Sequence, residues 1–211
     1  MQVRIMDEMF LGFLAEFGQA TSRQEVPQSS IQRYSGILPD RLLDYWQEHG
    51  WSGYGDGLFW TVNPQEYEPI LEPWLSASGL KMDEKHFVIA RSAFGELYVW
   101  GARSGLLLTV SSYLGRYSHL NLEQTIDLNT QIGAFFYMRN LTDDRLDGLF
   151  DEALARLGSL KPDEVYGFVP ALALGGSLTV DNLQKVKIIE YLEFLSQLSP
   201  LQDWHFPDIR I

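Results

Sequence analysis

The sequence predicts an α+β fold in which N-terminal helices are followed by an antiparallel β-meander and then by a smaller, mostly helical C-terminal domain. Apolar residues recur at helical spacing near the start, and short aromatic and β-branched runs separated by glycine turns fill the middle. Helical spacing returns after Tyr117. A chain of 211 residues is long enough for one large domain or two small ones. Since the pattern changes from strand to helix after Tyr117, we expect two domains, over residues 1–117 and 118–211.

The N-terminal part is expected to contain two helices joined by a loop. Residues 3–17 place their apolar side chains on one helical face, and Gly18 is a suitable stop. Residues 19–36 are rich in glutamine, serine and threonine and carry few apolar side chains, so we expect a loop. A proline and an aspartate then begin a short helix over residues 39–49, which a glycine closes.

The middle of the chain is expected to be mainly strands. Residues 51–57 hold three glycines and one aspartate, which favour a turn, and residues 58–62 have strand composition. A helix beginning at residue 63 is expected to be kinked or broken by Pro69 and Pro73. Three more runs of strand composition predict the antiparallel meander, at residues 86–91, 96–101 and 106–112.

The C-terminal part is expected to be helical. A weaker helix pair is predicted over residues 122–139, and a clearer helix over 142–157 has one apolar stripe. Two prolines bracket a further short helix between residues 162 and 169, and a longer helix follows over 179–198. The tail, residues 199–211, contains aromatic residues and is expected to dock on the rest.

The most distinctive segment is Lys161–Gly176, KPDEVYGFVPALALGG. Its first proline and its acids suit a helix start, and its paired glycines allow a tight turn or a close backbone approach. In physical terms it is a packed structural corner with no nucleophile–base pair and no set of metal ligands. As a pattern, the segment resembles the Tdi-type C-terminal domain of bacterial type VI secretion immunity proteins. Residues 38–75 and 94–100 resemble the GAD-like domain that precedes it.

What the resemblance implies is a toxin inhibitor and not an enzyme. The protein would bind a cognate secreted toxin in the cytoplasm, with a DNase as the expected class, by occluding the toxin's active site or fold, and would need no cofactor. Two alternatives stay open from the residues themselves. One is a hydrolase with dispersed catalytic carboxylates, and the other is a protein-interaction module unrelated to immunity.

The charge of the chain agrees with a basic protein partner. The formal net charge is −12, and both parts share it: residues 1–116 hold 14 acids against 9 bases, and residues 117–211 hold 14 against 7. Such a surface repels nucleic acid backbones, so direct DNA or RNA binding is not expected. It attracts a cationic surface such as a nuclease cleft, although many proteins are acidic for solubility alone.

The composition also limits the cellular setting. The chain has no cysteine, so disulfides and thiolate chemistry are excluded and a reducing cytoplasm fits. The apolar run at the N-terminus is interrupted by acids and has no small-residue cleavage site, which argues against a signal peptide. No stretch of about 18 uncharged apolar residues is present, so we expect no spanning helix and no membrane partner.

Motifs for catalysis or metal binding are absent from the sequence. The four histidines are scattered singly, and no nucleophile elbow, phosphate loop or dinucleotide fingerprint occurs. GYGDG within residues 53–57 lacks the lysine and hydroxyl residue of a phosphate loop and fits a turn. Paired acids lie at helix starts or on polar faces, where solvation and the helix dipole explain them. We therefore predict no catalytic, metal or cofactor residues.

Two sets of residues are candidates for binding a partner. The spacing of the acids in the predicted helix 142–157 puts three on one face, where a basic toxin surface can dock or water can solvate them: Asp144, Asp147 and Asp151. The glycine-rich turn supplies aromatic side chains as possible anchors beside an acid, with core packing as the alternative for Trp51: Trp51, Tyr54 and Asp56.

Overall fold

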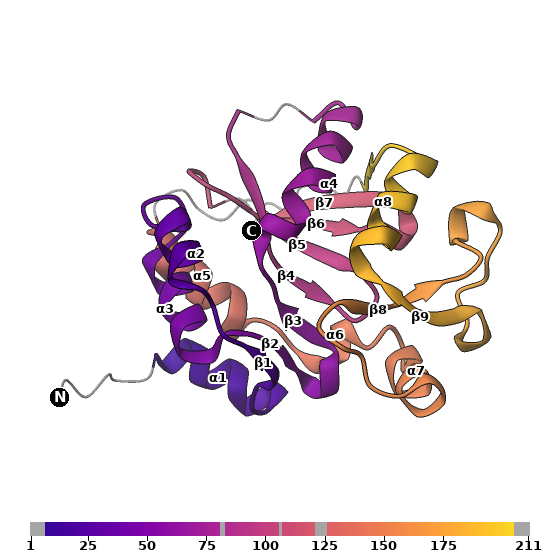
Figure 1. Ribbon diagram of the computed structural model, residues 1–211, viewed down its shortest axis with the longest axis horizontal. Helices are drawn as coiled ribbons and strands as arrows, with labels where there is room; N and C mark the ends of the chain where they lie inside the picture. Colours follow the sequence, from indigo (N-terminus) through magenta and orange to yellow (C-terminus); the bar gives the residue numbers. More distant parts are fainter. Residues whose placement is uncertain (1–6, 81–82, 106, 121–125, 205–211) are drawn as a thin grey trace, which may run out of the picture.

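The fold is built on an eight-stranded, mostly antiparallel sheet (Figure 1). The computed structural model describes residues 7–80, 83–105, 107–120 and 126–204. Strands β1 to β7 lie side by side in chain order, and β10 pairs with β7 to form the last strand of the sheet. The strands are β1 Thr21–Gln24, β2 Trp51–Tyr54, β3 Phe59–Thr61, β4 His86–Ser92, β5 Glu96–Gly101, β6 Leu107–Ser111, β7 Arg116–Leu120 and β10 Gln202–Asp203. The α+β prediction with an antiparallel meander is confirmed.

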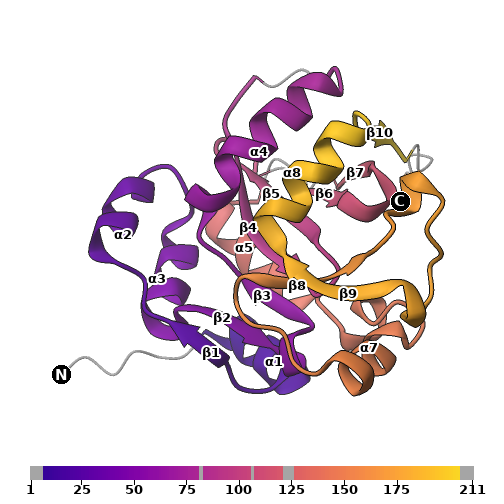
Figure 2. The same cartoon turned by 45° about the vertical axis from the view of Figure 1, so that its right-hand side comes forward.

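Helices lie on both sides of this sheet. Helices α1 and α3 both contact α5 in one group, and α4 contacts α8 in another (Figures 1 and 2). The helices are α1 Glu8–Phe17, α2 Gln28–Tyr34, α3 Asp40–His49, α4 Pro64–Ala77, α5 Leu128–Tyr137, α6 Leu141–Asp144, α7 Leu149–Leu157 and α8 Ile188–Leu198. Short 3₁₀ turns occupy η1 Gly55–Gly57, η2 Ser112–Leu114, η3 Leu172–Leu174 and η4 Val180–Asn182.

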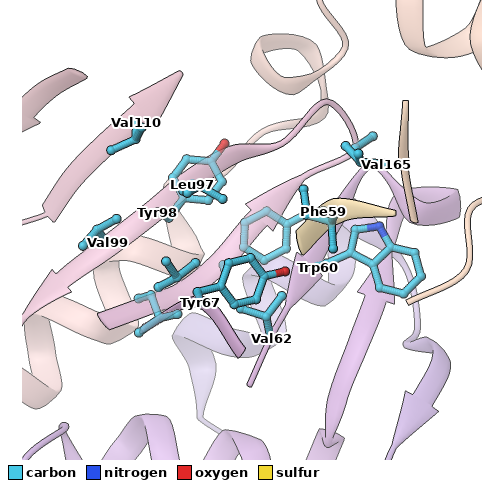
Figure 3. Packing of buried hydrophobic residues seen from close by; sticks show 14 of the residues in the cluster. Phe59, Trp60, Val62, Tyr67, Leu97, Tyr98, Val99, Val110 and Val165 are labelled. Atoms are coloured by element: carbon cyan, nitrogen blue, oxygen red, sulfur yellow. The ribbon is translucent and has the colours of Figure 1, made fainter. Parts of the chain in front are cut away.

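The core forms because successive strand residues point to opposite faces of the sheet. On β3, the Phe59 ring packs 5.4 Å from Phe13 of α1 and 6.2 Å from Phe136 of α5. The guanidinium of Arg91 lies over the ring of the next residue, Trp60, with the Arg91 Cζ atom 5.0 Å from the ring centre. Figure 3 shows Phe59 and Trp60 among other buried hydrophobic side chains. Both faces of the sheet are therefore buried at its centre.

A second, two-stranded sheet joins the C-terminal segment to this core. Strands β8 Glu164–Phe168 and β9 Leu183–Lys187 pair in antiparallel register. The Tyr166 amide donates to the Ala93 carbonyl at 2.9 Å, in the turn between β4 and β5. The guanidinium of buried Arg91 donates to the carbonyls of Pro162 and Glu164 at 2.8 and 2.9 Å. The two predicted domains thus contact each other through buried polar bonds, and the boundary at residue 117 stays a prediction.

The tail docks as expected over residues 199–204. Strand β10 pairs with β7 in parallel, and the Trp74 indole of α4 donates to the Ser199 carbonyl at 3.1 Å. The Leu201 amide donates to Ser78 Oγ at 2.8 Å. The remaining tail residues, 205–211, lie outside the described residues, as do residues 3–6 of the first predicted helix and residues 122–125 of the predicted pair.

Several predictions in the N-terminal half are confirmed, and three are wrong. The predicted helices at 3–17 and 39–49 appear as α1 and α3, each closed by a glycine with positive φ. The predicted loop 19–36 instead contains β1 and α2, because Ile31 and Tyr34 share a helical face and are buried there. The predicted turn 51–57 begins as a strand, since β2 pairs with both β1 and β3.

Helix α4 runs through its two internal prolines without a break, so the predicted division into short turns is wrong. Pro69 and Pro73 are four residues apart on the exposed side of the helix. The carbonyls that lose their intrahelical partners therefore face water, while Tyr67, Leu71 and Trp74 are buried on the opposite side. Tertiary packing on that buried face holds the helix together.

In the C-terminal half, long-range pairing replaces two predicted helical stretches. The helix predicted between residues 162 and 169 is strand β8, and the first part of the one predicted over 179–198 is η4 and β9. Each strand supplies the other's backbone partners, which outweighs the local helix signals. Strand β7 also carries β-structure three residues past Tyr117, and α5 covers residues 128–137 of the predicted helix pair.

Candidate functional site

The predicted acidic stripe does not lie on one helix. Helix α6 ends at Asp144, and α7 begins only at Leu149. Between them, Leu146, Asp147 and Gly148 all have positive φ values, of 47°, 52° and 89°, which breaks the helix. The spacing argument for a shared face is therefore wrong. Asp147 is exposed in the turn, and Asp151 is exposed in the first turn of α7, where it forms an ion pair with Arg145.

The two aromatic residues of the second candidate set belong to the core. Trp51 is 7% exposed and packs 5.9 Å from the Trp46 ring. Tyr54 is fully buried, packs 5.0 Å from Phe13, and has its pKa raised by that burial. Asp56 is exposed in η1 with a φ of 59°. Core packing, the alternative for Trp51, is what the structure shows, and Asp56 alone of this set reaches the surface.

An acidic hollow of about 300 Å³ lies between α1 and α3. On α3, three exposed acids recur every fourth residue and so lie along one face: Asp40, Asp44 and Glu48. The remaining lining residues come from α1, α3 and the start of α5: Asp7, Phe10, Leu11, Arg41, Tyr45, His49 and Asn129. We call this cavity the α1–α3 hollow.

Hydrogen bonds fix the walls of the α1–α3 hollow. The Asp7 carboxylate caps α1, accepts the Tyr45 hydroxyl, and pairs with Arg41 at 3.1 Å. The Arg41 amide donates to Asn129 Oδ1 of α5 at 2.9 Å. Burial lowers the pKa of His49, whose ring stacks on Phe10 at 4.5 Å, so this imidazole is neutral at pH 7. Four carboxylates against one guanidinium give the lining a formal charge of −3.

A second hollow, of about 340 Å³, lies between α4 and the start of β4. Two of its four acids, Glu68 and Glu84, accept hydrogen bonds from neighbouring groups of the same chain. Glu68 accepts from Arg33 and from the Tyr34 hydroxyl at 2.9 Å each. Glu84 accepts from the backbone amides of Arg103 and Ser104. Four carboxylates against Lys85 leave this lining with a formal charge of −3 as well.

These arrangements can bind cationic side chains, but they carry no metal site. Among the residues that the structure describes, no three histidine or acidic side chains converge as metal ligands do. The i, i+4, i+8 spacing of acids in residues 40–48 was the sequence signal that could have located the α1–α3 hollow. Which α1 residues face α3 depends on tertiary packing, and no local pattern shows it. Within the described part of the chain, no helix is both long and apolar enough to cross a membrane.

Comparisons with known proteins agree with this architecture. The family model for the GAD-like domain matches residues 8–114, and that for the T6SS immunity protein Tdi1, C-terminal, matches residues 130–199. The chain is similar in fold to the crystal structure of Atu4351 from Agrobacterium tumefaciens, with a TM-score of 0.80, 22% identity and 94% of each chain covered. No curated protein sequence matches it significantly. The chain therefore belongs to the GAD-like family, and a T6SS immunity protein Tdi1 C-terminal domain follows its GAD-like domain.

Proposed function

We propose that this protein binds a cognate type VI secreted toxin and neutralises it by stoichiometric occlusion of the toxin's active site or fold. The observation that carries the proposal is the match of two family models in the order expected of an immunity protein, over residues 8–114 and 130–199. That membership supports an immunity role and a non-catalytic protein. An inhibitor of this kind needs neither a cofactor nor a catalytic residue, and it would act in the cytoplasm of the producing cell.

A DNase is the toxin class that the electrostatics favour. A nuclease needs a cationic cleft to hold phosphates, and this chain offers a net charge of −12 with acids on several surfaces. An interface of typical size buries on the order of 1,600 Å², enough for an acidic surface to cover such a cleft. Asp56, Asp147 and Asp151 remain candidates for partner contacts outside the α1–α3 hollow. Asp144 remains a candidate from the sequence alone, because its side chain lies outside the described part of the structure.

Titration of toxin against inhibitor tests this proposal. The product of the adjacent open reading frame is made by cell-free translation, and its cleavage of plasmid DNA is followed as this protein is added. Inhibition that is complete at a fixed molar ratio, together with rescue of cells expressing that product, supports stoichiometric immunity. Rescue far below equimolar amounts indicates an enzyme. An unaffected, non-binding product would refute the proposal.

A further inference from the structure

The loop between β8 and β9 holds apolar side chains in water. It covers residues 169–182 and exposes Val169, Leu174 and Leu178, by 41%, 59% and 50%. Ala171 of the same loop is buried and attaches it to the core. The three exposed side chains, which we call the apolar face of the loop, are therefore not part of its attachment to the fold. A tight hairpin joins two strands with about two residues, and longer loops often carry function.

Hydrogen bonds fix the shape of this loop. The Asn182 side-chain amide donates to the carbonyls of Pro170 and Ser177 at 3.0 and 2.9 Å. The Val169 amide donates to the Asn182 carbonyl at 2.8 Å. One asparagine thus ties both ends of the loop to its middle. A loop that is ordered before binding loses less conformational entropy when it binds, so its exposed side chains suit use as anchors.

A neighbouring turn adds to this apolar surface. Turn η2 contacts η3, which lies in the loop, and the Tyr113 ring of η2 packs 5.6 Å from Phe168, the last residue of β8. The next residue of η2, Leu114, is 41% exposed. Exposed apolar side chains therefore occur on two segments that contact each other, whereas a single exposed leucine is ordinary.

The loop is almost free of charge. Asp181 is the one charged residue between Glu164 and Lys185. Contact with an apolar partner surface therefore removes few charges from water, so no large desolvation cost opposes it. The α1–α3 hollow and the second hollow each carry a formal charge of −3, so charge alone does not select either of them for a partner.

We propose that the apolar face of the β8–β9 loop anchors this protein on an apolar, uncharged part of the toxin surface. Leu174 and Leu178 would be buried at the centre of that interface, where apolar side chains are enriched and charged ones are depleted. The inference rests on the proposed function and adds the face of the inhibitor and the kind of contact that it makes.

Net charge favours the toxin over a second copy of this chain as the occupant. Two copies, each with a formal net charge of −12, repel each other, whereas a cationic toxin is attracted. Long-range attraction brings the toxin to the protein, and the uncharged loop then supplies short-range apolar contacts that slow dissociation. Substitutions in the apolar face should therefore change dissociation and leave the salt dependence of association unchanged.

A fluorescent label reports directly whether the apolar face is covered. The chain has no cysteine, so one introduced cysteine can be labelled alone with an environment-sensitive fluorophore. Leu178→Cys places the label on the apolar face. Gln32→Cys places it on the exposed surface of α2, at the opposite end of the molecule from β8 and β9 (Figures 1 and 2). When the cell-free toxin is added, we expect the Leu178→Cys label to shift its emission to the blue and the Gln32→Cys label to keep its emission.

Binding kinetics measure what the apolar face contributes. In Leu174→Ala/Leu178→Ala we expect Kd to rise about 30-fold, mainly through faster dissociation, because the exposed half of each leucine no longer becomes buried. The control Met138→Ala removes an apolar side chain that is 63% exposed at the end of α5, and its Kd should stay within about twofold of the wild type. Urea midpoints near the wild-type value establish that each variant is folded. The single Leu174→Ala, with an expected rise of about fivefold, replaces the pair if the pair is unfolded.

The outcomes distinguish failure of the surface from failure of the function. If the wild-type protein neither binds nor protects, the immunity proposal fails and this inference falls with it. If it does both, but either the blue shift or the rise in Kd is missing, the function stands and the loop is not the anchor. A blue shift that grows with the concentration of the labelled protein alone identifies a second copy as the occupant. Emission that is already blue in dilute protein, compared with the Gln32→Cys label, identifies another segment of this chain, and either result overturns the inference.

Discussion

Arg91 is predicted to stabilise the contact between the main sheet and the C-terminal segment. Its side chain is fully buried, donates to the carbonyls of Ser92, Pro162 and Glu164, and lies over the Trp60 ring. Arg91→Met keeps much of the volume and removes every donor. Two carbonyls of the C-terminal segment then lose a charged donor, at about 1–3 kcal/mol each.

The net effect is smaller than the sum of those losses. Burial lowers the pKa of Arg91, which means that holding this cation inside is costly, and a methionine avoids that cost. We therefore expect a loss of about 3 kcal/mol in the free energy of unfolding. Urea unfolding measures it as a lower midpoint at unchanged m value. Hydrogen exchange should speed up first at the Tyr166 amide, which bonds to the Ala93 carbonyl.

Arg33→Met is the matched control for this prediction. Arg33 also forms a charged hydrogen bond, to Glu68 at 2.9 Å, but about half of its side chain is exposed. An exposed pair of this kind contributes little to stability, because water competes for both groups and solvent screens their attraction. Equal effects of the two substitutions would refute the reasoning, since burial of the donor would then make no difference.

Two further predictions concern the loop between β8 and β9 and the partly buried histidines His49 and His86. Gly176→Ala should destabilise the protein by about 1–3 kcal/mol, because its Cβ would lie 2.0 Å from the Pro170 carbonyl oxygen; a urea midpoint equal to that of the wild type would contradict this. Burial lowers the pKa of His49 and of His86, so below about pH 6.5 the unfolded chain binds more protons and stability falls. His49→Gln should reduce the drop in urea midpoint between pH 7.5 and 5.5, and an undiminished drop would show that His49 does not contribute.

Sequence patterns predicted the elements that local signals determine. Helix α3 has a proline before it, a glycine after it and a buried stripe that includes Leu42 and Trp46, and it appeared at the expected residues. The hairpin of β4 and β5 was predicted from composition and a short turn, and its pairing is confirmed. In these segments, local propensity and tertiary packing favour the same structure.

Predictions failed where a distant partner decides the backbone. Pro162 and Asp163 come directly before strand β8 and indicate a helix start, yet β9 and Arg91 supply partners for the backbone here. In the helix predicted to carry the acidic stripe, Gly148 was a sequence signal for a helix break. The left-handed backbone at Leu146 had no such signal in the sequence. Burial of Trp51 and Tyr54 depends on packing from α1 and α3, so spacing within one turn could not decide it.

The parallel pairing of β10 with β7 has a consequence for synthesis of the protein on the ribosome. Strands β1 to β7 are complete once residue 120 has emerged, whereas the strand that covers β7 lies more than 80 residues later, at Gln202–Asp203. Until then, β7 presents unpaired backbone groups that another nascent chain can bind. A product shortened before residue 202 would keep that edge open, so premature termination should yield aggregating material even when every preceding helix has formed.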